Sequence, residues 1–320
     1  MIIVHILHNL NEVFFFCFVF LRILNIILRE TEVMKKEGNQ EDVERLREWL
    51  LKQPHHPKVI EDRMLSAFVY GSKSLEIAKQ KLESFFTWRA HLRDNYPFFY
   101  IRDPSDPYFK NSLKSGNMFF LPKTTPEGYR VFYTGITDQF EEHYDHDQTT
   151  ACFHMSLELS MDQWPDMKGI FIIWDLKGFK PSYAARLNLS TFETTIRYLQ
   201  DVYPVKMKGV VFLNTPAIVE TFYNTIFKPF LKEKLKKRIT ITREDSKCLK
   251  KYLPEEILPS DLGGKEKSSA EFNEDWLNLL IEKKDGIKSY SLLVADESKR
   301  PPETKQTFGI EGTFRTLAID

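Results

Sequence analysis

Apolar and polar positions divide the chain into a helical part and a part in which strands and helices alternate. Between Gln40 and Asp94, apolar residues recur at helical spacing in three stretches, "EDVERLREWLLKQ", "EDRMLSAFVYG" and "SLEIAKQKLESFFTWRAHLRD". Pro54 and Gly71 end the first two stretches, and Ser74 is placed to cap the third. The pattern predicts a three-helix N-terminal subdomain over residues 34–103.

Beyond Pro104 and Pro107 the apolar period changes. "NMFFLP", "YRVFYTGIT" and "RITIT" read as strands, and "KGIFIIWDLKGF" and "MKGVVFLNTP" are typical of strands buried on both faces. Helical stretches such as "QTTACFHMSLELSMDQ" and "STFETTIRYLQDVY" stand between them. The alternation predicts an α/β fold, a mostly parallel sheet covered by helices, over residues 104–284. Residues 285–320 are polar and proline-bearing, and we expect a loosely packed tail.

The first 33 residues are apolar and are expected to lie outside the fold. "VFFFCFVFLRILNIIL", from Val13 to Leu28, is shorter than the roughly 20 residues of a membrane helix. It also lacks the basic start and small-residue cleavage site of a secretory signal. Met34 opens a polar run that resembles a natural start. An upstream extension and a weak membrane anchor remain the two interpretations of residues 1–33.

Composition narrows the class of protein. The 320 residues include 45 basic and 45 acidic side chains, and this zero net charge argues against nucleic-acid binding. The 26 phenylalanines suffice for an aromatic core or for the lining of a cavity. Cys17, Cys152 and Cys248 form no CxxC pair, which favours a reducing, cytoplasmic setting without structural zinc.

The sequence gives little support for a catalytic site or a metal site. "DLKG", from Asp175 to Gly178, follows a buried strand, but no glycine-rich phosphate loop accompanies it, so an aspartate capping the strand end is favoured. "EEHYDHD" places His143 and His146 among carboxylates too crowded for one face of an element, which favours a solvated loop over a metal site. No nucleophile motif is present. We therefore expect no enzyme activity, no metal and no cofactor.

A basic segment follows an apolar helix near the end of the predicted sheet. "FKPFLKEKLKKRITI" begins at Phe227, directly after a stretch that places Ile218, Phe222 and Ile226 on one stripe. Lys206 and Lys208 precede the neighbouring strand, so parallel strands would bring them close to Arg238. Anionic phosphates or an anionic membrane are the natural partners of such a patch, at about 1 kcal/mol per cation near the surface. A solvated charged face is the alternative.

Four stretches together resemble the CRAL-TRIO lipid-binding family. In chain order they are the helical "AKQKLESFFTWR", then "FIIWDLKGF", "YPVKMKGVVFLNTPAIVETFYNTIFKPFLKEKLKKRI" and "LPSDLGG". The likeness spans about residues 40–265, and the motifs follow the order of the family. The resemblance implies an N-terminal helical domain and a sheet with a lipid pocket, closed by a gate helix over about Pro216–Phe227 that carries Ile218, Phe222 and Ile226. Residues 104–284 would be the lipid-binding domain.

The resemblance also implies a function. The chain is most similar to the tocopherol- and retinoid-carrying members, which bind a hydrophobic small molecule and carry it between membranes. It implies a cytoplasmic, peripherally membrane-associated protein that binds phosphatidylinositol phosphates through Lys206, Lys208, Lys234 and Arg238. A lipid-sensing signalling or scaffold module without transfer is the alternative. The aligned apolar positions expected to line the pocket are Phe153, Leu157, Ile170, Trp174, Phe179, Leu199, Tyr203, Val210 and Phe222.

Two departures from the family pattern qualify these expectations. The family often has Phe-Leu-Arg where this chain has Phe68, Val69 and Tyr70, so the patch lacks an arginine that Lys73 would have to replace. Phosphatidylinositol carriers have glutamate where this chain has Val205. An apolar ligand with little headgroup is therefore favoured over phosphatidylinositol.

Overall fold

The computed structural model describes residues 39–96, 103–107, 109, 116–136 and 144–302. The chain divides into two units, residues 1–45 and 46–320, and the described end of the first unit, residues 39–45, is helical. In the second unit α2 spans Asp62–Gly71 and α3 spans Leu75–Asn95. The Ser74 side chain accepts a hydrogen bond from the Ile77 amide, which confirms the predicted cap. No helix among these residues is long and apolar enough to cross a membrane, and the segment Val13–Leu28 lies outside them.

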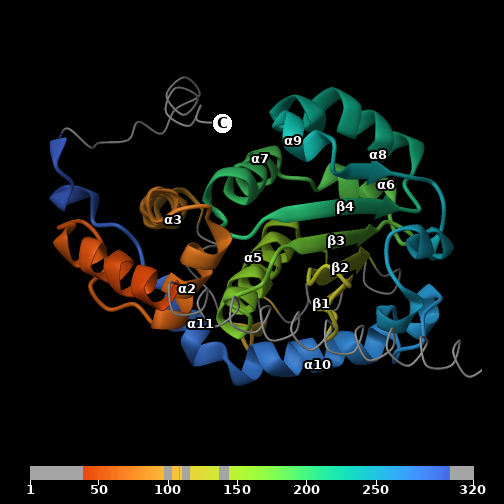
Figure 1. The fold of residues 1–320 in the computed structure, drawn as a ribbon. Helices are drawn as coiled ribbons and strands as arrows, with labels where there is room; N and C mark the ends of the chain where they lie inside the picture. Colours follow the sequence, from red (N-terminus) through yellow and green to blue (C-terminus); the bar gives the residue numbers. More distant parts are fainter. Residues whose placement is uncertain (1–38, 97–102, 108, 110–115, 137–143, 303–320) are drawn as a thin grey trace, which may run out of the picture. The chain divides into compact units, whose positions relative to one another are not determined.

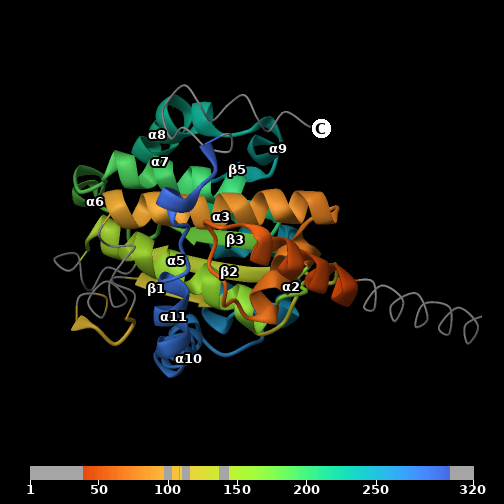
Figure 2. The ribbon, with the colours of Figure 1, turned by 90° about the vertical axis from the view of Figure 1, so that its left-hand side faces the viewer.

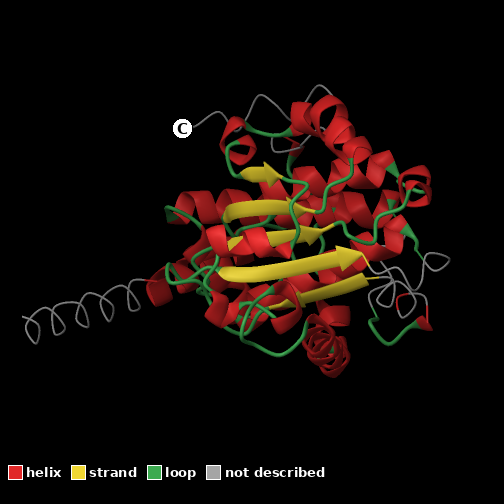
Figure 3. Ribbon diagram, turned by 90° about the vertical axis from the view of Figure 1, so that its right-hand side faces the viewer, coloured by secondary structure: helices red, strands yellow, loops and turns green. Residues whose placement is uncertain are grey.

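Five strands form one sheet in sequence order (Figure 1, Figure 3). They are β1 Gly116–Phe120, β2 Arg130–Ile136, β3 Ile170–Asp175, β4 Met207–Leu213 and β5 Ile239–Ile241. β1 pairs antiparallel with β2, and β2 to β5 are parallel. Parallel neighbours need crossover connections, which the intervening helices supply. The predicted mostly parallel α/β sheet is confirmed.

Helices cover one face of the sheet. α5 spans His146–Gln163, α6 Pro181–Ala185 and α7 Leu189–Arg197, and α7 continues into a π-helical turn at Tyr198–Val202. Figure 2 shows α3, α5 and α7 in front of the strands. The opposite side carries short turns, Ser246–Lys251, Glu255–Ile257 and Ser260–Leu262 (Figure 3). Apolar residues on both faces of β3 and β4 therefore find partners.

The connection from β4 to β5 is a series of short helical pieces. It consists of α8 Ala217–Phe222, a π-helical turn Tyr223–Phe227, a 3₁₀ turn Lys228–Phe230 and α9 Glu233–Lys236. We name residues 217–227 the gate segment. The sequence predicted one continuous helix there, whereas the hydrogen bonding widens to π geometry at Tyr223, a change that is often found at functional sites.

The expectation of a loosely packed tail after Asp285 is wrong for residues up to 302. After α10, Ser269–Glu282, the chain forms α11, Lys284–Ser291, and a last turn at Glu297–Lys299. Ala295 and Arg300 are 1% and 4% exposed. The polar composition gave the wrong prediction because the buried side chain, Arg300, is itself charged and pairs with Glu83 on α3. Residues 303–320 lie outside the described part.

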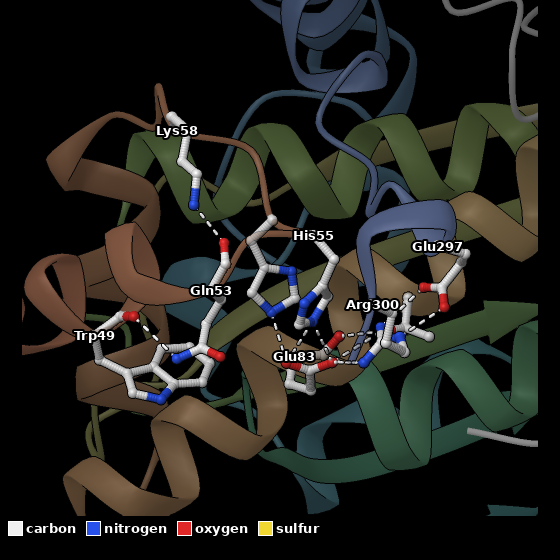
Figure 4. A network of polar contacts seen from close by, with 9 residues as sticks. Trp49, Gln53, His55, Lys58, Glu83, Glu297 and Arg300 are labelled. Carbon is white, nitrogen blue, oxygen red and sulfur yellow. Dashed lines mark hydrogen bonds and ion pairs between the residues drawn. The ribbon is translucent and has the colours of Figure 1, made fainter. Parts of the chain in front are cut away.

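These partners form a network that we name the C-terminal clasp, composed of His55, His56, Glu83, Glu297 and Arg300 (Figure 4). The Glu83 carboxylate accepts hydrogen bonds from His55 Nε2 at 3.1 Å and from His56 Nε2 at 2.6 Å, and it pairs with Arg300. Arg300 also donates to a Glu297 oxygen at 2.6 Å and to Thr87 Oγ1 at 2.6 Å. The clasp joins the last described turn to α3 and to the loop before α2.

The clasp also contains three side chains of the kinds that bind metals. The ligand atoms of His55, His56 and Glu83 lie within 4.8 Å of one another. Arg300, however, already balances the charge of the Glu83 carboxylate. Burial, with the nearby charge of His56, lowers the pKa of His55 and favours its neutral form. The contacts thus account for the cluster as an internal polar network.

Candidate functional site

An apolar cavity of about 480 Å³ lies at the carboxyl-terminal edge of the parallel strands. It is bounded by the ends of β2, β3 and β4, the start of the antiparallel β1, the first half of α5, and the gate segment. Ligands of open α/β sheets bind at this edge in general, because the connecting segments leave a crevice there. The volume is in the range of small-molecule sites, roughly 300–1,000 Å³.

Aromatic rings on adjacent elements form the floor of the cavity. Trp174 of β3 stacks on Phe212 of β4, with ring centroids 5.5 Å apart and planes 9° apart, and it also stacks on Phe153 of α5 at 5.9 Å. Trp174 and Phe212 are register partners on neighbouring strands, so their side chains share one face. Phe212 was missed in the sequence analysis, although its two-residue spacing from Val210 indicates the same face.

The gate segment closes the cavity from the β4–β5 side. Its lining side chains include Ile218, Phe222 and Ile226, the three residues expected on the gate helix, of which Phe222 was also expected to line the pocket, together with Val219, Tyr223 and Phe227. Phe192 of α7 contacts both Phe222 and Phe227, with ring centroids 5.6 and 5.1 Å apart. Residues 217–227 therefore pack against α7 through aromatic contacts.

The two ends of the gate segment are packed differently. No residue of α8 is buried, and Ile218 is 54% exposed although it also lines the cavity. At the other end, Phe227 and Leu231 are buried in one cluster with Ile196. Regions with few buried contacts open at the lowest free-energy cost. The α8 end is therefore packed less tightly than the end at Phe227.

Polar side chains line one part of an otherwise apolar wall. Asn117, Thr134, Tyr144, His146 and Thr149 come from the start of β1, the end of β2 and the region where α5 begins. Burial lowers the pKa of His146, an effect that Asp147, 3.7 Å away, opposes. The neutral imidazole is suited to a hydrogen bond with a single polar group of an otherwise apolar ligand. His143, the other histidine of the "EEHYDHD" stretch, lies outside the described residues.

Of the nine residues expected to line the pocket, five lie at the cavity. These are Phe153, Trp174, Phe179, Leu199 and Phe222. The other four, Leu157, Ile170, Tyr203 and Val210, do not line the cavity; they are buried in the core. Ile170 and Val210 share faces with Trp174 and Phe212 but stand nearer the amino ends of their strands, and Leu157 lies one turn beyond Phe153. The Tyr203 hydroxyl donates to the Leu157 carbonyl at 3.2 Å, beneath α5.

Three of the four predicted basic residues come from the opposite, amino-terminal edge of β4 and β5, and the fourth lies on α9. Lys206 and Lys208 flank the first residue of β4, and Arg238 precedes β5 and donates to the Met207 carbonyl at 2.5 Å. Lys234 lies on α9 and is exposed, as is Lys206. Lys208 lies over the Tyr129 ring, 4.7 Å from its centroid. The structure thus brings Lys206, Lys208 and Arg238 to one edge of the sheet.

Asp175, the one residue considered for magnesium chemistry, is engaged in local contacts. It accepts hydrogen bonds from the Lys177 amide at 2.9 Å, from Asn214 Nδ2 at 2.8 Å and from the Tyr133 hydroxyl at 3.1 Å. These contacts fasten the ends of β2, β3 and β4 together beside the cavity. The side chain therefore caps the strand end, as its sequence context favours. Cys152 lines the cavity, and its burial raises the pKa of its thiol.

Comparison with known proteins gives matches along most of the chain. A family model described as CRAL/TRIO domain matches residues 114–264, and one described as Pinta-like, UBA domain matches residues 35–109. The human alpha-tocopherol transfer protein-like protein is 30% identical over 239 residues, 74% of this chain and 68% of that protein. Human clavesin-2 is 29% identical over 185 residues, 57% and 55% of the two chains. The crystal structure of Sfh5 is 16% identical, covers 79% of this chain and 98% of its own, and gives a TM-score of 0.44.

Proposed function

The chain belongs to the CRAL/TRIO family, and on this basis we propose that it binds a hydrophobic small molecule in the cavity and transfers it between membranes. The observation that carries the proposal is the apolar cavity beneath a weakly packed gate segment. Burial of apolar surface supplies the affinity, at about 0.8 kcal/mol per CH₂ group. A ligand with a dozen such carbons gains on the order of 10 kcal/mol before the costs of binding.

An affinity of that size makes release into water slow, so release has to occur at a membrane. We propose that Lys206, Lys208, Lys234 and Arg238 dock on anionic headgroups, with phosphatidylinositol phosphates as the preferred lipids. Ile218 and Ile226, which are exposed at the cavity, and Leu189 on α7 supply an apolar rim that can enter the interface. A membrane that binds the open gate more tightly than the closed gate shifts the equilibrium towards release.

The cargo class follows from the lining. The wall is aromatic and aliphatic, and its polar groups are few and neutral, which suits a tocopherol- or retinoid-like molecule with one hydroxyl or carbonyl group. Val205 is 5% exposed, so that position offers neither a charge nor a free surface to a phosphorylated headgroup. The name of one human relative, alpha-tocopherol transfer protein-like, is consistent with this class.

The proposal is tested in two steps. Organic extraction of the purified full-length protein, followed by mass spectrometry, identifies any bound molecule, and we expect an apolar lipid with a small polar group. Transfer of that molecule between phosphatidylcholine vesicles is then measured with and without phosphatidylinositol phosphates in the acceptor. A protein that binds the lipid but never accelerates its transfer would be a lipid sensor or scaffold. A protein that binds no lipid would refute the proposal.

A further inference from the structure

His146 is a polar side chain in the wall of an apolar cavity, and its ring nitrogens form no hydrogen bond with the part of the chain that the structure describes. It is the first residue of α5, and its side chain is 11% exposed. The Nδ1 atom is fully buried and has no hydrogen-bond partner. A buried polar group without a partner is costly, because it has given up its hydrogen bonds to water. In a cavity wall, such a group points to a polar atom of the ligand as its partner.

The neighbouring carboxylate of Asp147 decides which ring nitrogen carries the proton. Its Oδ1 atom lies 3.7 Å from Nδ1 of His146 and is itself buried without a hydrogen-bond partner, while Asn188 Nδ2 donates to the other oxygen at 3.2 Å. A distance of 3.7 Å is too long for a hydrogen bond, but the carboxylate attracts an N–H group and repels a lone pair. A neutral imidazole has one N–H group. The proton therefore lies on Nδ1, and Nε2 presents a lone pair.

The imidazole lies at the end of the cavity that is farthest from the gate segment in the order of the strands. Asn117 of β1 and Thr134 of β2 line the same end as His146, whereas the gate segment belongs to the connection between β4 and β5. Trp174 of β3 forms the floor between the two ends. Neighbouring strands are about 4.8 Å apart, so β2 and β4 are separated by about 10 Å. A cargo with its polar group at His146 therefore extends its apolar part across Trp174 towards the gate segment.

A lone pair on Nε2 distinguishes between the polar groups that a lipid can carry. A hydroxyl group donates its hydrogen to Nε2 and still accepts hydrogen bonds from other groups of the wall. The oxygen of an aldehyde, a ketone or an ether only accepts, so it leaves Nε2 unpaired in the closed cavity. A site that is built to bind a hydroxyl group discriminates against analogues that lack it, because its own polar atom is then left without a partner.

We propose that His146, with its proton held on Nδ1 by Asp147, selects a cargo with a hydroxyl group over one with an aldehyde, ketone or ether oxygen in the same place. The inference rests on the proposed function, in that the cavity has to bind an apolar molecule. It adds the chemical class of the polar group, the residue that recognises it and the direction in which the cargo lies. His146 is then the specificity-determining residue of the cavity, and Asp147 is a positioning residue that acts through it.

The test uses three probes that share one apolar chain and differ only at its end, namely farnesol, farnesal and farnesyl methyl ether. Equilibrium binding of each radiolabelled probe to the full-length protein is measured, and we expect the wild type to bind the alcohol about tenfold more tightly than the other two. H146F keeps a ring but removes both nitrogens, so it should bind all three alike. T149V is the matched control, because the Thr149 hydroxyl already donates to the Asp145 carbonyl at 2.7 Å; it should keep the preference for the alcohol.

D147N tests the position of the proton without changing His146. Because Asn188 donates to one oxygen of Asp147, the amide of D147N places its own oxygen there and turns its NH₂ group towards Nδ1. An NH₂ group donates to a lone pair, so the proton moves to Nε2, which then becomes a donor. We expect D147N to bind farnesal more tightly than farnesyl alcohol binds to it, a reversal of the wild-type order. A merely structural role of Asp147 would weaken the binding of all three probes together.

The outcomes separate this inference from the function proposed above. Equal affinity of the wild type for the three probes overturns the inference and leaves the proposed function standing, because the cavity still binds an apolar chain. A preference for the alcohol that persists in H146F overturns the assignment to His146. If thermal unfolding shows that H146F does not fold, D147N decides: reversal supports the inference, and an unchanged order overturns it. A wild type that binds no probe and yields no lipid on extraction refutes the proposed function, and the inference fails with it.

Discussion

Removing the charge of Arg300 tests whether the C-terminal clasp holds the end of the described fold. The Arg300 side chain is 1% exposed and pairs with Glu83 and Glu297. In R300M the hydrocarbon volume is largely kept, while the partly buried Glu83 loses its cationic partner. Breaking a buried ion pair by removing one partner costs about 3–5 kcal/mol, because the other charge remains desolvated. We expect R300M to lower the free energy of unfolding by about 3 kcal/mol.

The neighbouring residue provides a matched control. Lys299 pairs with Asp296 at 2.8 Å, but its side chain is 64% exposed. Exposed pairs contribute about 0–1 kcal/mol, so K299M should leave stability nearly unchanged. Urea unfolding, followed by tryptophan fluorescence and circular dichroism, measures both variants. Equal effects of R300M and K299M would refute the view that the clasp is a buried network.

The clasp also gives stability a defined pH dependence. Because burial and His56 hold the pKa of His55 below 6.5, the unfolded chain takes up this proton first, and stability falls as the pH drops below about 6.5. Burial alone would raise the pKa of Glu83, but His56 and Arg300 hold it at about 2. Its stabilisation is thus present above pH 4.5 and is lost towards pH 2, on the order of 3 kcal/mol. H55Q should reduce the first loss, to which the lowered pKa of His146 also contributes; an unchanged profile in H55Q would contradict the assignment.

Three further predictions concern the cavity and the docking residues. The variant K206Q/K234Q changes two exposed cations, so its partitioning to anionic vesicles should weaken by about 2 kcal/mol, or about thirtyfold, which co-sedimentation measures. Its binding of lipid in solution should not change, and fluorescence titration checks this. L157A should cost about 2–5 kcal/mol in unfolding free energy and leave ligand affinity intact, whereas W174A should reduce ligand affinity, which titration of both variants checks. Because burial holds the pKa of His146 low, its protonation should weaken cargo binding as the pH falls below its ordinary value of 6.5, and a pH titration of H146Q should lack that step.

The sequence predicts which side of a strand a side chain faces better than it predicts how far along the strand the cavity extends. Alternation in β3 and β4 identifies the side chains that point to one side of the sheet, and Trp174 of that set lines the cavity. The same alternation selects Ile170 and Val210, which lie nearer the amino ends of their strands, in solid core. How far the cavity extends depends on where α5 and the gate segment stop covering the sheet. That boundary arises from packing between segments and leaves no local signature.

The clasp shows a second limit. Composition after Asp285 indicates solvent exposure, because burial of arginine and glutamate is rare. Arg300 is nevertheless buried because Glu83 and Thr87, more than 200 residues earlier, supply its partners. Pairing of this kind depends on tertiary proximity. Polar composition therefore does not predict disorder where a charged side chain of the segment pairs with a carboxylate elsewhere in the fold.

The parallel topology connects the cavity with the basic residues through one segment of the chain. A connection between parallel strands must return from the carboxyl edge of the sheet to its amino edge. Between β4 and β5 this return is made by the gate segment and α9, so one continuous segment begins at the cavity and ends at Lys234 and Arg238. Its buried anchor, Phe227 with Leu231, divides a cationic end from an α8 end in which no residue is buried. In the proposed function we therefore expect opening to begin at the α8 end, where the fewest buried contacts have to be broken, and to end at this anchor.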